Sequence, residues 1–160
     1  MASTLKVKIE ENIILDNQDY GSKRVLEVGS IASIVKRIVN IGTNEIGLLG
    51  FGTAYNTELS KSYLAGQFDE DNVRYIRITN LDGTNHIALV LKNENNDEFG
   101  VKVDKGCSFL YCADLAGGVV DTMDSADAAG ITPNSFGDLV DITCASDTAA
   151  CDVEVFVAST

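Results

Sequence analysis

Alternation of apolar and polar residues with a period of two constrains this chain more than any other feature. Residues 73–79 alternate in this way, as do residues 5–9, 34–41 and 99–103. A period of two places successive side chains on opposite faces of a strand, so that one face can be buried. About ten such runs follow one another at short intervals, which is typical of a sandwich or barrel. We therefore predict an all-β fold: one antiparallel, jelly-roll-like β-sandwich domain over residues 1–160.

The pairing of some strands can also be predicted. Four consecutive runs are separated by short polar segments, the first of which contains the turn signal Asp82-Gly83, and they are expected to form an antiparallel meander. The four runs are 73–79, 87–91, 99–103 and 108–111. Near the end of the chain, residues 139–143 and 153–157 are predicted to pair with each other as a hairpin.

Residues 113–137 interrupt the alternation, because Gly, Ala and Asp dominate this stretch. We predict a long connection between strands, with a short helix near residues 125–129 that Ser125 would cap. Long loops in compact domains tend to be functional or to make contacts. No other segment has the composition of a linker, so the chain is expected to be one domain.

Charge is abundant and unevenly placed. The chain has 24 acidic and 12 basic residues, for a net charge of -12, and residues 106–160 contain no Lys or Arg. Phosphate binding needs clustered Lys and Arg, so nucleic acid is not expected as the main partner. The last third has nine acids: Asp114, Asp121, Asp124, Asp127, Asp138, Asp141, Asp147, Asp152 and Glu154. They predict either a solvated acidic face or an outward-facing surface that guides assembly.

No apolar run approaches the ~20 residues of a membrane span, and residues 1–6 lack the apolar core of a secretory signal. We expect a chain made in the cytoplasm, not secreted by a signal peptide, with no membrane partner. The four cysteines are then expected as buried free thiols, with a Cys144–Cys151 disulfide as the alternative. Their spacings, which place Cys107 five residues before Cys112, do not match a zinc site.

The residues for catalysis are scarce. His86 is the only histidine. It is therefore the only histidine available as a base beside a nucleophile, and a zinc hydrolase site would lack a second histidine ligand. The carboxylates of residues 69–71 do not follow the pattern of a calcium-binding loop. The glycines of residues 47–52 lack the lysine of a phosphate-binding loop. We predict no enzyme activity, no cofactor and no metal.

Two basic doublets are candidates for an interface. Lys23 is followed by Arg24, and Lys36 is followed by Arg37. These charges are too few for a nucleic-acid stripe, but they suit contact with an acidic surface of a neighbouring subunit.

Two stretches carry a resemblance to a known class of protein. They are YLAGQFDEDNVRYIRITNLD, from Tyr63 to Asp82, and FGVKVDKGCSFL, from Phe99 to Leu110. The order of arginine-bearing strand, Thr-Asn, turn, strand, acidic turn, strand, Gly and aromatic strand resembles small β-sandwich structural proteins of tailed bacteriophages, especially marine ones. The resemblance covers roughly residues 62–111 and, more weakly, residues 153–157.

Some proteins of that class decorate or cement the capsid, so the resemblance implies a virion protein without catalytic residues. Its partners would be the major capsid protein or neighbouring virion proteins, it would lie on the capsid exterior, and it would be a homo-oligomer, with a trimer favoured. One alternative is another virion component, such as a tail, neck or fibre part that binds host glycans through Tyr55, Tyr63 and Tyr111. The other is a soluble enzyme on a jelly-roll or cupin-like barrel, which would need several metal ligands.

Overall fold

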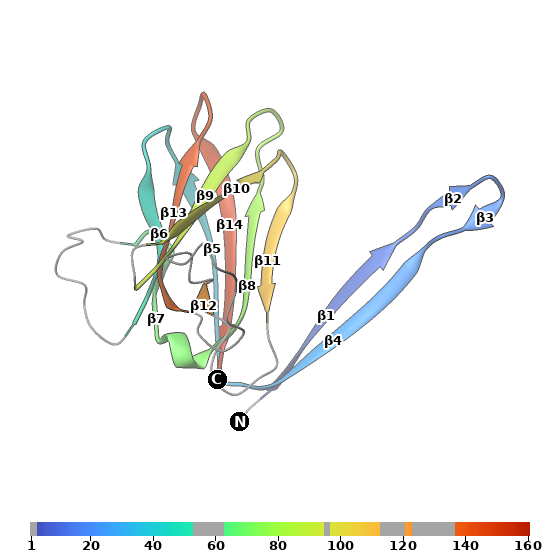
Figure 1. Cartoon of the computed structure of the whole chain (residues 1–160), viewed down its shortest axis with the longest axis horizontal. Coiled ribbons are helices and arrows are strands. Elements are labelled where there is room, and N and C mark those ends of the chain that lie inside the picture. The colour runs from blue at the N-terminus through green and yellow to red at the C-terminus, as the bar shows by residue number, and fades with distance from the viewer. Residues whose placement is uncertain (1–2, 53–62, 95–96, 113–120, 123–136) are drawn as a thin grey trace, which may run out of the picture.

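The computed structural model describes residues 3–52, 63–94, 97–112, 121–122 and 137–160. These residues form strands almost throughout, with one 3-10 turn, η1 (Glu70–Asn72). Figure 1 shows two parts: a body of two packed sheets, and a long two-stranded hairpin that projects from it. We call this hairpin, residues 3–31, the arm. The predicted all-β, sandwich-like fold is confirmed.

The six-stranded sheet of the body has the order β10-β9-β13-β6-β7, and β12 pairs with β13 off this path. Its neighbours are antiparallel except for β6 and β7, which run parallel. Its strands are β6 (Ile46–Phe51), β7 (Gly66–Phe68), β9 (Ile87–Asn93), β10 (Glu98–Val103), β12 (Asp121–Thr122) and β13 (Gly137–Ser146).

The four-stranded sheet has the order β11-β8-β14-β5 and is antiparallel throughout. Its strands are β5 (Ser33–Ile41), β8 (Val73–Asn80), β11 (Ser108–Cys112) and β14 (Cys151–Ser159). Among the described residues, β5 and β11 are the edge strands of this sheet.

The core lies between the two sheets, because alternation turns one apolar face of each strand inward. Ile76 and Ile78 of β8 and Val155 of β14 meet Leu89 of β9 and Ile142 of β13, and all five are fully buried. The face of β8 that carries Ile76 and Ile78 is therefore the core face.

The arm is formed by β1 (Ser3–Glu11), which pairs antiparallel with β4 (Ser22–Ile31). Two short strands, β2 (Ile14–Leu15) and β3 (Gln18–Asp19), continue the hairpin to its tip. Only Ala32 separates β4 from β5, so the arm continues directly into an edge strand of the body.

The predicted meander of four strands is wrong. β9 and β10 do pair as a hairpin, but β8 and β11 pair with each other in the opposite sheet. The turn signals mark where the chain reverses and do not say which sheet receives the next strand. Asn80 is fully buried at this crossing, where its side-chain amide donates to the backbone oxygens of Asn85 (2.9 Å) and Val103 (3.3 Å). These bonds tie together the two connections that cross between sheets.

The predicted hairpin of residues 139–143 and 153–157 is also wrong. β13 pairs with β9 and β6, whereas β14 pairs with β8 and β5, so the short connection between them crosses from one sheet to the other. The Ser146 backbone N–H donates to Gly42 (2.9 Å) and that of Asp147 to His86 (3.1 Å), which anchors this crossing on two neighbouring turns.

The expected long connection at residues 113–137 lies outside the described residues, apart from β12 and the first residue of β13. The short helix expected near residues 125–129 also lies outside them. No helix in the described part of the chain is long and apolar enough to cross a membrane.

Candidate functional site

The arm is the part of the fold that the sandwich core does not require. Figure 1 shows it leaving the end of the body where the C-terminus lies and extending away from both sheets. A two-stranded hairpin is at best marginally stable in water by itself. The arm therefore depends on contacts at its base and on whatever its tip meets.

The base of the arm is held by a small second core. Val28 and Ile31 of β4 are buried against Tyr75 of β8 and Ala158 of β14. Tyr75 and Ala158 point to the outer face of the four-stranded sheet, because they alternate with residues of the main core. Four partly buried side chains surround the cluster: Leu5, Val7, Leu26 and Phe156.

A bulge in β4 sets the direction in which the arm leaves. Ser3 pairs with Ile31 and Leu5 pairs with Val28, so β4 has one more residue than β1 in this interval. Ser30 lies within it and has a φ of 60°. A bulge of this kind bends a strand and increases its twist. The extra residue thus turns the hairpin away from the body.

The shaft of the arm carries ion pairs on its solvent-exposed face. Lys6 Nζ lies 2.7 Å from Glu27 Oε1, and Lys23 Nζ lies 3.7 Å from Glu10 Oε2. All four side chains are more than half exposed, so each pair contributes little to stability. They fix register more than they hold the strands together.

The tip closes in a two-residue turn. Asp16 and Asn17 have φ values of 50° and 62°, which is the geometry of a type I′ turn. Asp and Asn tolerate this left-handed region better than other residues with a side chain. The Tyr20 backbone N–H donates to the Ile13 carbonyl at 3.0 Å and continues the pairing below the turn.

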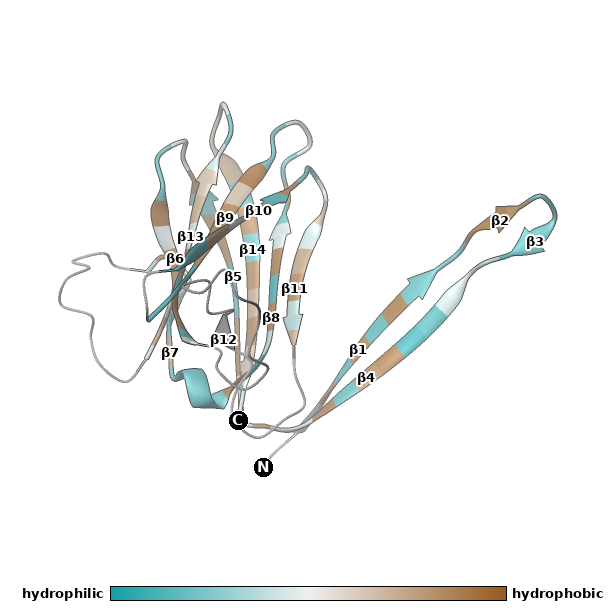
Figure 2. Cartoon of the chain, in the orientation of Figure 1, coloured by the Kyte–Doolittle hydropathy of each residue, from teal (hydrophilic) through white to brown (hydrophobic). Residues whose placement is uncertain are grey.

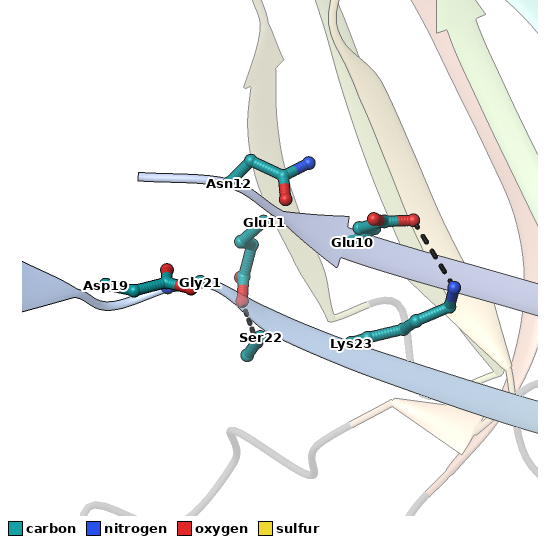
Figure 3. Close-up of a pocket in the computed structure, with 7 residues that line it drawn as sticks. All are labelled: Glu10, Glu11, Asn12, Asp19, Gly21, Ser22 and Lys23. Carbon is teal, nitrogen blue, oxygen red and sulfur yellow. Dashed lines mark hydrogen bonds and ion pairs between the residues drawn. The ribbon is translucent and has the colours of Figure 1, made fainter. Parts of the chain in front are cut away.

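Polar contacts join the tip to the shaft around a shallow hollow (Figure 3). The Ser22 hydroxyl donates to the Glu11 carboxylate, and Lys23 reaches Glu10 on the opposite strand. Gly21 is required here, because a Cβ atom would lie 2.7 Å from the Glu11 carbonyl oxygen. The hollow is lined by polar and charged groups and offers no apolar wall to a ligand.

Large apolar side chains at the tip face solvent. Ile13, Ile14, Leu15 and Tyr20 are 53%, 76%, 58% and 59% exposed. Figure 2 shows the brown of β2 at the far end of the arm, beyond any part of the body. Residues 10–21 contain four acids, Glu10, Glu11, Asp16 and Asp19, and no Lys or Arg. The tip is therefore an apolar surface with negative charge around it.

A second exposed apolar surface lies on β5. Ile34 and Ile38 point to the outer face of the four-stranded sheet and are 56% and 61% exposed, with exposed Lys36 between them. β5 contains Lys36 and Arg37 and no acid. We call residues 34, 36 and 38 the β5 face.

Glu154 partly balances the positive charge beside the β5 face. Its carboxylate lies 3.0 Å from Lys36 Nζ and also pairs with Arg77, whose guanidinium lies 5.8 Å from the centre of the Phe156 ring. One carboxylate thus faces two cations in this row. Exposed Asp152 of β14 lies in the same row, beside Asn40, and the exposed Arg37 alternates with Lys36 at the edge of the sheet.

The two doublets predicted as an interface lie in different places. Lys23 and Arg24 are exposed on the shaft of the arm, whereas Lys36 and Arg37 are exposed on β5. The structure does not bring them into one patch. Each doublet does lie on an element that also carries exposed apolar residues, the arm in one case and β5 in the other.

Only some of the acidic residues in the last third of the chain lie at the surface. Asp141 is buried and Glu154 is occupied by two cations, whereas Asp138, Asp147 and Asp152 are exposed. The backbone of Asp121 lies in β12. The remaining three acids, Asp114, Asp124 and Asp127, lie outside the described residues.

The expectation of buried thiols is right for two cysteines and wrong for the other two. Cys144 and Cys151 are buried, Cys107 and Cys112 are exposed, and all four are free. Cys112 is the last residue of β11, and Cys107 lies in the turn before it. β11 is an edge strand of its sheet, where both side chains are exposed. Burial, together with the neighbouring Cys151, raises the pKa of Cys144 to about 12, so its thiol is protonated and unreactive at neutral pH.

His86 has a structural setting. Its Nδ1 lies 3.3 Å from Asp147 Oδ2, beside the connection between β13 and β14. In the described residues no three His, Cys, Asp or Glu side chains gather as metal ligands would.

The tyrosines named as candidates for glycan binding under the alternative reading have other contacts where they are described. The Tyr63 ring lies over Gly50 and its hydroxyl bonds to Asp141; burial is the main cause that raises the Tyr63 pKa, and Asp141 raises it further. Tyr111 packs against the main core. Tyr55 lies outside the described residues.

The tip residues were not among the sequence-predicted sites. Two signals for them were present: Asp16-Asn17 is a turn pair, and Ile13-Ile14-Leu15 is an apolar run that breaks the alternation. Neither signal says that the hairpin projects, because that depends on the bulge at Ser30. Comparisons with family models, with curated proteins and with solved structures each found no match for this chain.

Proposed function

We propose that this chain is a non-enzymatic structural protein of a phage virion, which binds the assembled capsid shell from outside and stabilises it. The observation that carries the proposal is the arm, whose apolar tip projects beyond the body and faces solvent. An exposed apolar patch of this kind marks a site of protein contact. The resemblance of residues 62–111 to phage structural proteins suggests a phage virion as the assembly that the tip contacts.

The arm suits a protein that acts by contact. The arm is about 40 Å long, at about 3.3 Å per residue over the thirteen residues from Ser3 to Leu15, and its first residues pack on the body. A subunit with such an extension can bind a neighbour without body-to-body contact. A protein that binds the assembled shell and not its free subunits stabilises that shell by mass action.

The test is cosedimentation of the purified chain with tail-free heads of the phage that encodes it. The wild-type chain is expected to sediment with the heads and to raise the temperature at which they open. The matched comparison is a chain that lacks residues 10–21, which is expected to bind more weakly. Absence of the protein from tail-free heads, together with no affinity for them, would refute the proposal.

The alternative is another virion component, such as a tail, neck or fibre part. The arm would serve such a part equally well, since it is a contact element in either place. Binding of host glycans is less well supported, because Tyr63 and Tyr111 are engaged within the body. Recovery of the protein from purified tails and not from heads would favour this alternative.

A further inference from the structure

We propose that the arm tip of one copy docks on the β5 face of a second copy, so that the protein assembles by exchange of arms. This inference rests on the proposed function and names the partner of the same contact element. The occupant of the β5 face is residues 10–21 of a neighbouring chain of this protein.

The tip and the β5 strand differ in charge. Residues 10–21 contain four acids and no base, of which Glu10 pairs with Lys23 of the shaft, whereas β5 contributes Lys36 and Arg37 beside Glu154 and Asp152 of β14. Opposite charges around a contact steer the two surfaces together and disfavour other pairings. Two tips would repel each other, so contact of a tip with the cations of β5 is favoured over contact with a second tip.

The surfaces also match in apolar character. The tip presents three consecutive aliphatic residues and Tyr20, and the β5 face presents Ile34 and Ile38 on either side of Lys36. Each aliphatic side chain that leaves water on docking stabilises the contact. The lysine stem between the isoleucines extends the apolar surface while its ammonium group stays in water.

β5 is also an edge strand among the described residues. Its strand partner there is β14, and no other described strand pairs with its opposite edge. Protein edges of this type are normally covered or paired. An incoming hairpin that packs on the β5 face can also cover this edge.

A tip cannot reach the β5 face of its own chain. The base of the arm is fixed by the second core, and Figure 1 shows the tip held at the end of the molecule opposite to the body. The partner must therefore be another molecule.

The junction joins two different patches, so it closes into a ring only when the rotation between copies is that of a symmetric dimer, trimer or larger ring. One tip has twelve residues, which is fewer than the ~20–30 residues per side of a standard interface. A ring contains two or three such junctions, and together they compensate for the small interface of each one. The predicted homo-oligomer, with a trimer favoured, is compatible with this arrangement.

The first experiment measures native mass by light scattering during gel filtration. The wild-type chain is expected at two or three times 17.1 kDa. Ile14→Asp at the tip and Ile38→Asp on β5 are each expected at the monomer mass. Both side chains are more than half exposed, so neither change is expected to unfold the chain.

Matched controls make the result specific. Val25→Asp changes a half-exposed apolar residue on the shaft of the same arm, opposite Lys8, and is expected to keep the wild-type mass. Leu110→Asp does the same on the opposite edge of the same sheet. A monomeric wild type, or loss of the oligomer in the controls as well as in the test variants, would overturn the inference.

Mixing identifies the two halves of the junction. The Ile38→Asp chain keeps an intact tip and the Ile14→Asp chain keeps an intact β5 face. A photoreactive residue at position 17 of the first, isotope-labelled chain is expected to capture residues 33–41 of the second. Capture elsewhere, or within one chain, would contradict arm exchange.

The same variants separate this inference from the proposed function. If the tip binds capsid protein instead of a second copy, the wild type is monomeric while Ile14→Asp still loses affinity for heads, and only the inference fails. If the wild type is an arm-exchanged oligomer that ignores heads, only the proposed function fails.

Discussion

The ring of Tyr63 fits against Gly50 because residue 50 has no side chain. A Cβ atom at position 50 would lie 2.2–2.7 Å from three atoms of the Tyr63 ring, so the ring can occupy its place only because residue 50 has no side chain. The ring in turn brings its hydroxyl to Asp141, a carboxylate that is almost fully buried on the neighbouring strand. One glycine thus permits both a packed ring and a hydrogen bond to a buried charge.

Gly50→Ala is expected to lower the free energy of unfolding by about 1–3 kcal/mol, because the ring must move and strain its surroundings. Urea denaturation measures this change. The control is Gly83→Ala, where a Cβ atom would have no neighbour within 4 Å. An equal effect at both positions would mean that loss of glycine, not the Tyr63 ring, is responsible.

Cys144 predicts a dependence of stability on alkaline pH. Its pKa is raised from about 9 to about 12 in the folded chain, so it stabilises the fold fully below pH 9 and this contribution is lost as pH rises towards 12. The slope from one such group is at most about 1.4 kcal/mol per pH unit. Denaturation curves of the wild type and of Cys144→Ala, each measured between pH 9 and 12, should therefore converge. Parallel curves would contradict this assignment.

At the scale of elements, the sequence predicts strands better than their partners. Alternation identifies β5, β8, β9 and β10, because a buried face needs apolar residues at every second position. The partner of a strand depends on long-range packing, which is why β8 and β11 pair although two strands lie between them in the chain. Buried Asn80, whose side chain ties two crossings together, reads in the sequence as one more polar turn residue.

The arm illustrates the same limit for the candidate site. Residues 5–9 alternate as a core strand would, and Leu5 and Val7 do pack at the base. Ile9 follows the same pattern, yet it is 48% exposed on the shaft. The pattern is local, whereas exposure is decided by a bend at Ser30 and by the length of the hairpin.

The turn at the tip is expected to set the stability of the arm. Asn17→Gly removes the cost of a left-handed residue and should tighten the hairpin, whereas Asp16→Val places a β-branched side chain where φ is 50° and should loosen it. Chemical shifts of Ile14 and Tyr20 report the change. A loosened turn that leaves these shifts unaltered would show that the tip is held by something other than its turn.

At the scale of the whole molecule, the arm and the body differ in how they are held. Strands β8 and β14 each have a neighbour on both sides and a buried face. Within the described part of the chain, β1 and β4 have only each other beyond the small core at the base. Such a region opens locally at far lower free energy than a packed core.

Amide hydrogen exchange should show this division. Amides of residues 8–24 are expected to exchange early in a dilute monomer, and those of β8, β9 and β14 late. In the oligomer the tip and β5 are expected to become protected together, since each covers the other. Protection of one without the other would argue against their contact.

The link of a single residue, Ala32, between β4 and β5 has a mechanical consequence. In a ring closed by exchanged arms, a force applied to one tip is transmitted along β4 into β5 of the same copy. The tip of the neighbouring copy is docked on that same β5 strand. Within each copy, tension then follows one continuous stretch of backbone from β4 to β5 and bypasses the sandwich core. The force that ruptures such a ring, measured in an optical trap, should be unchanged by Gly50→Ala and reduced by Ile38→Ala, which trims the apolar contact without adding a charge.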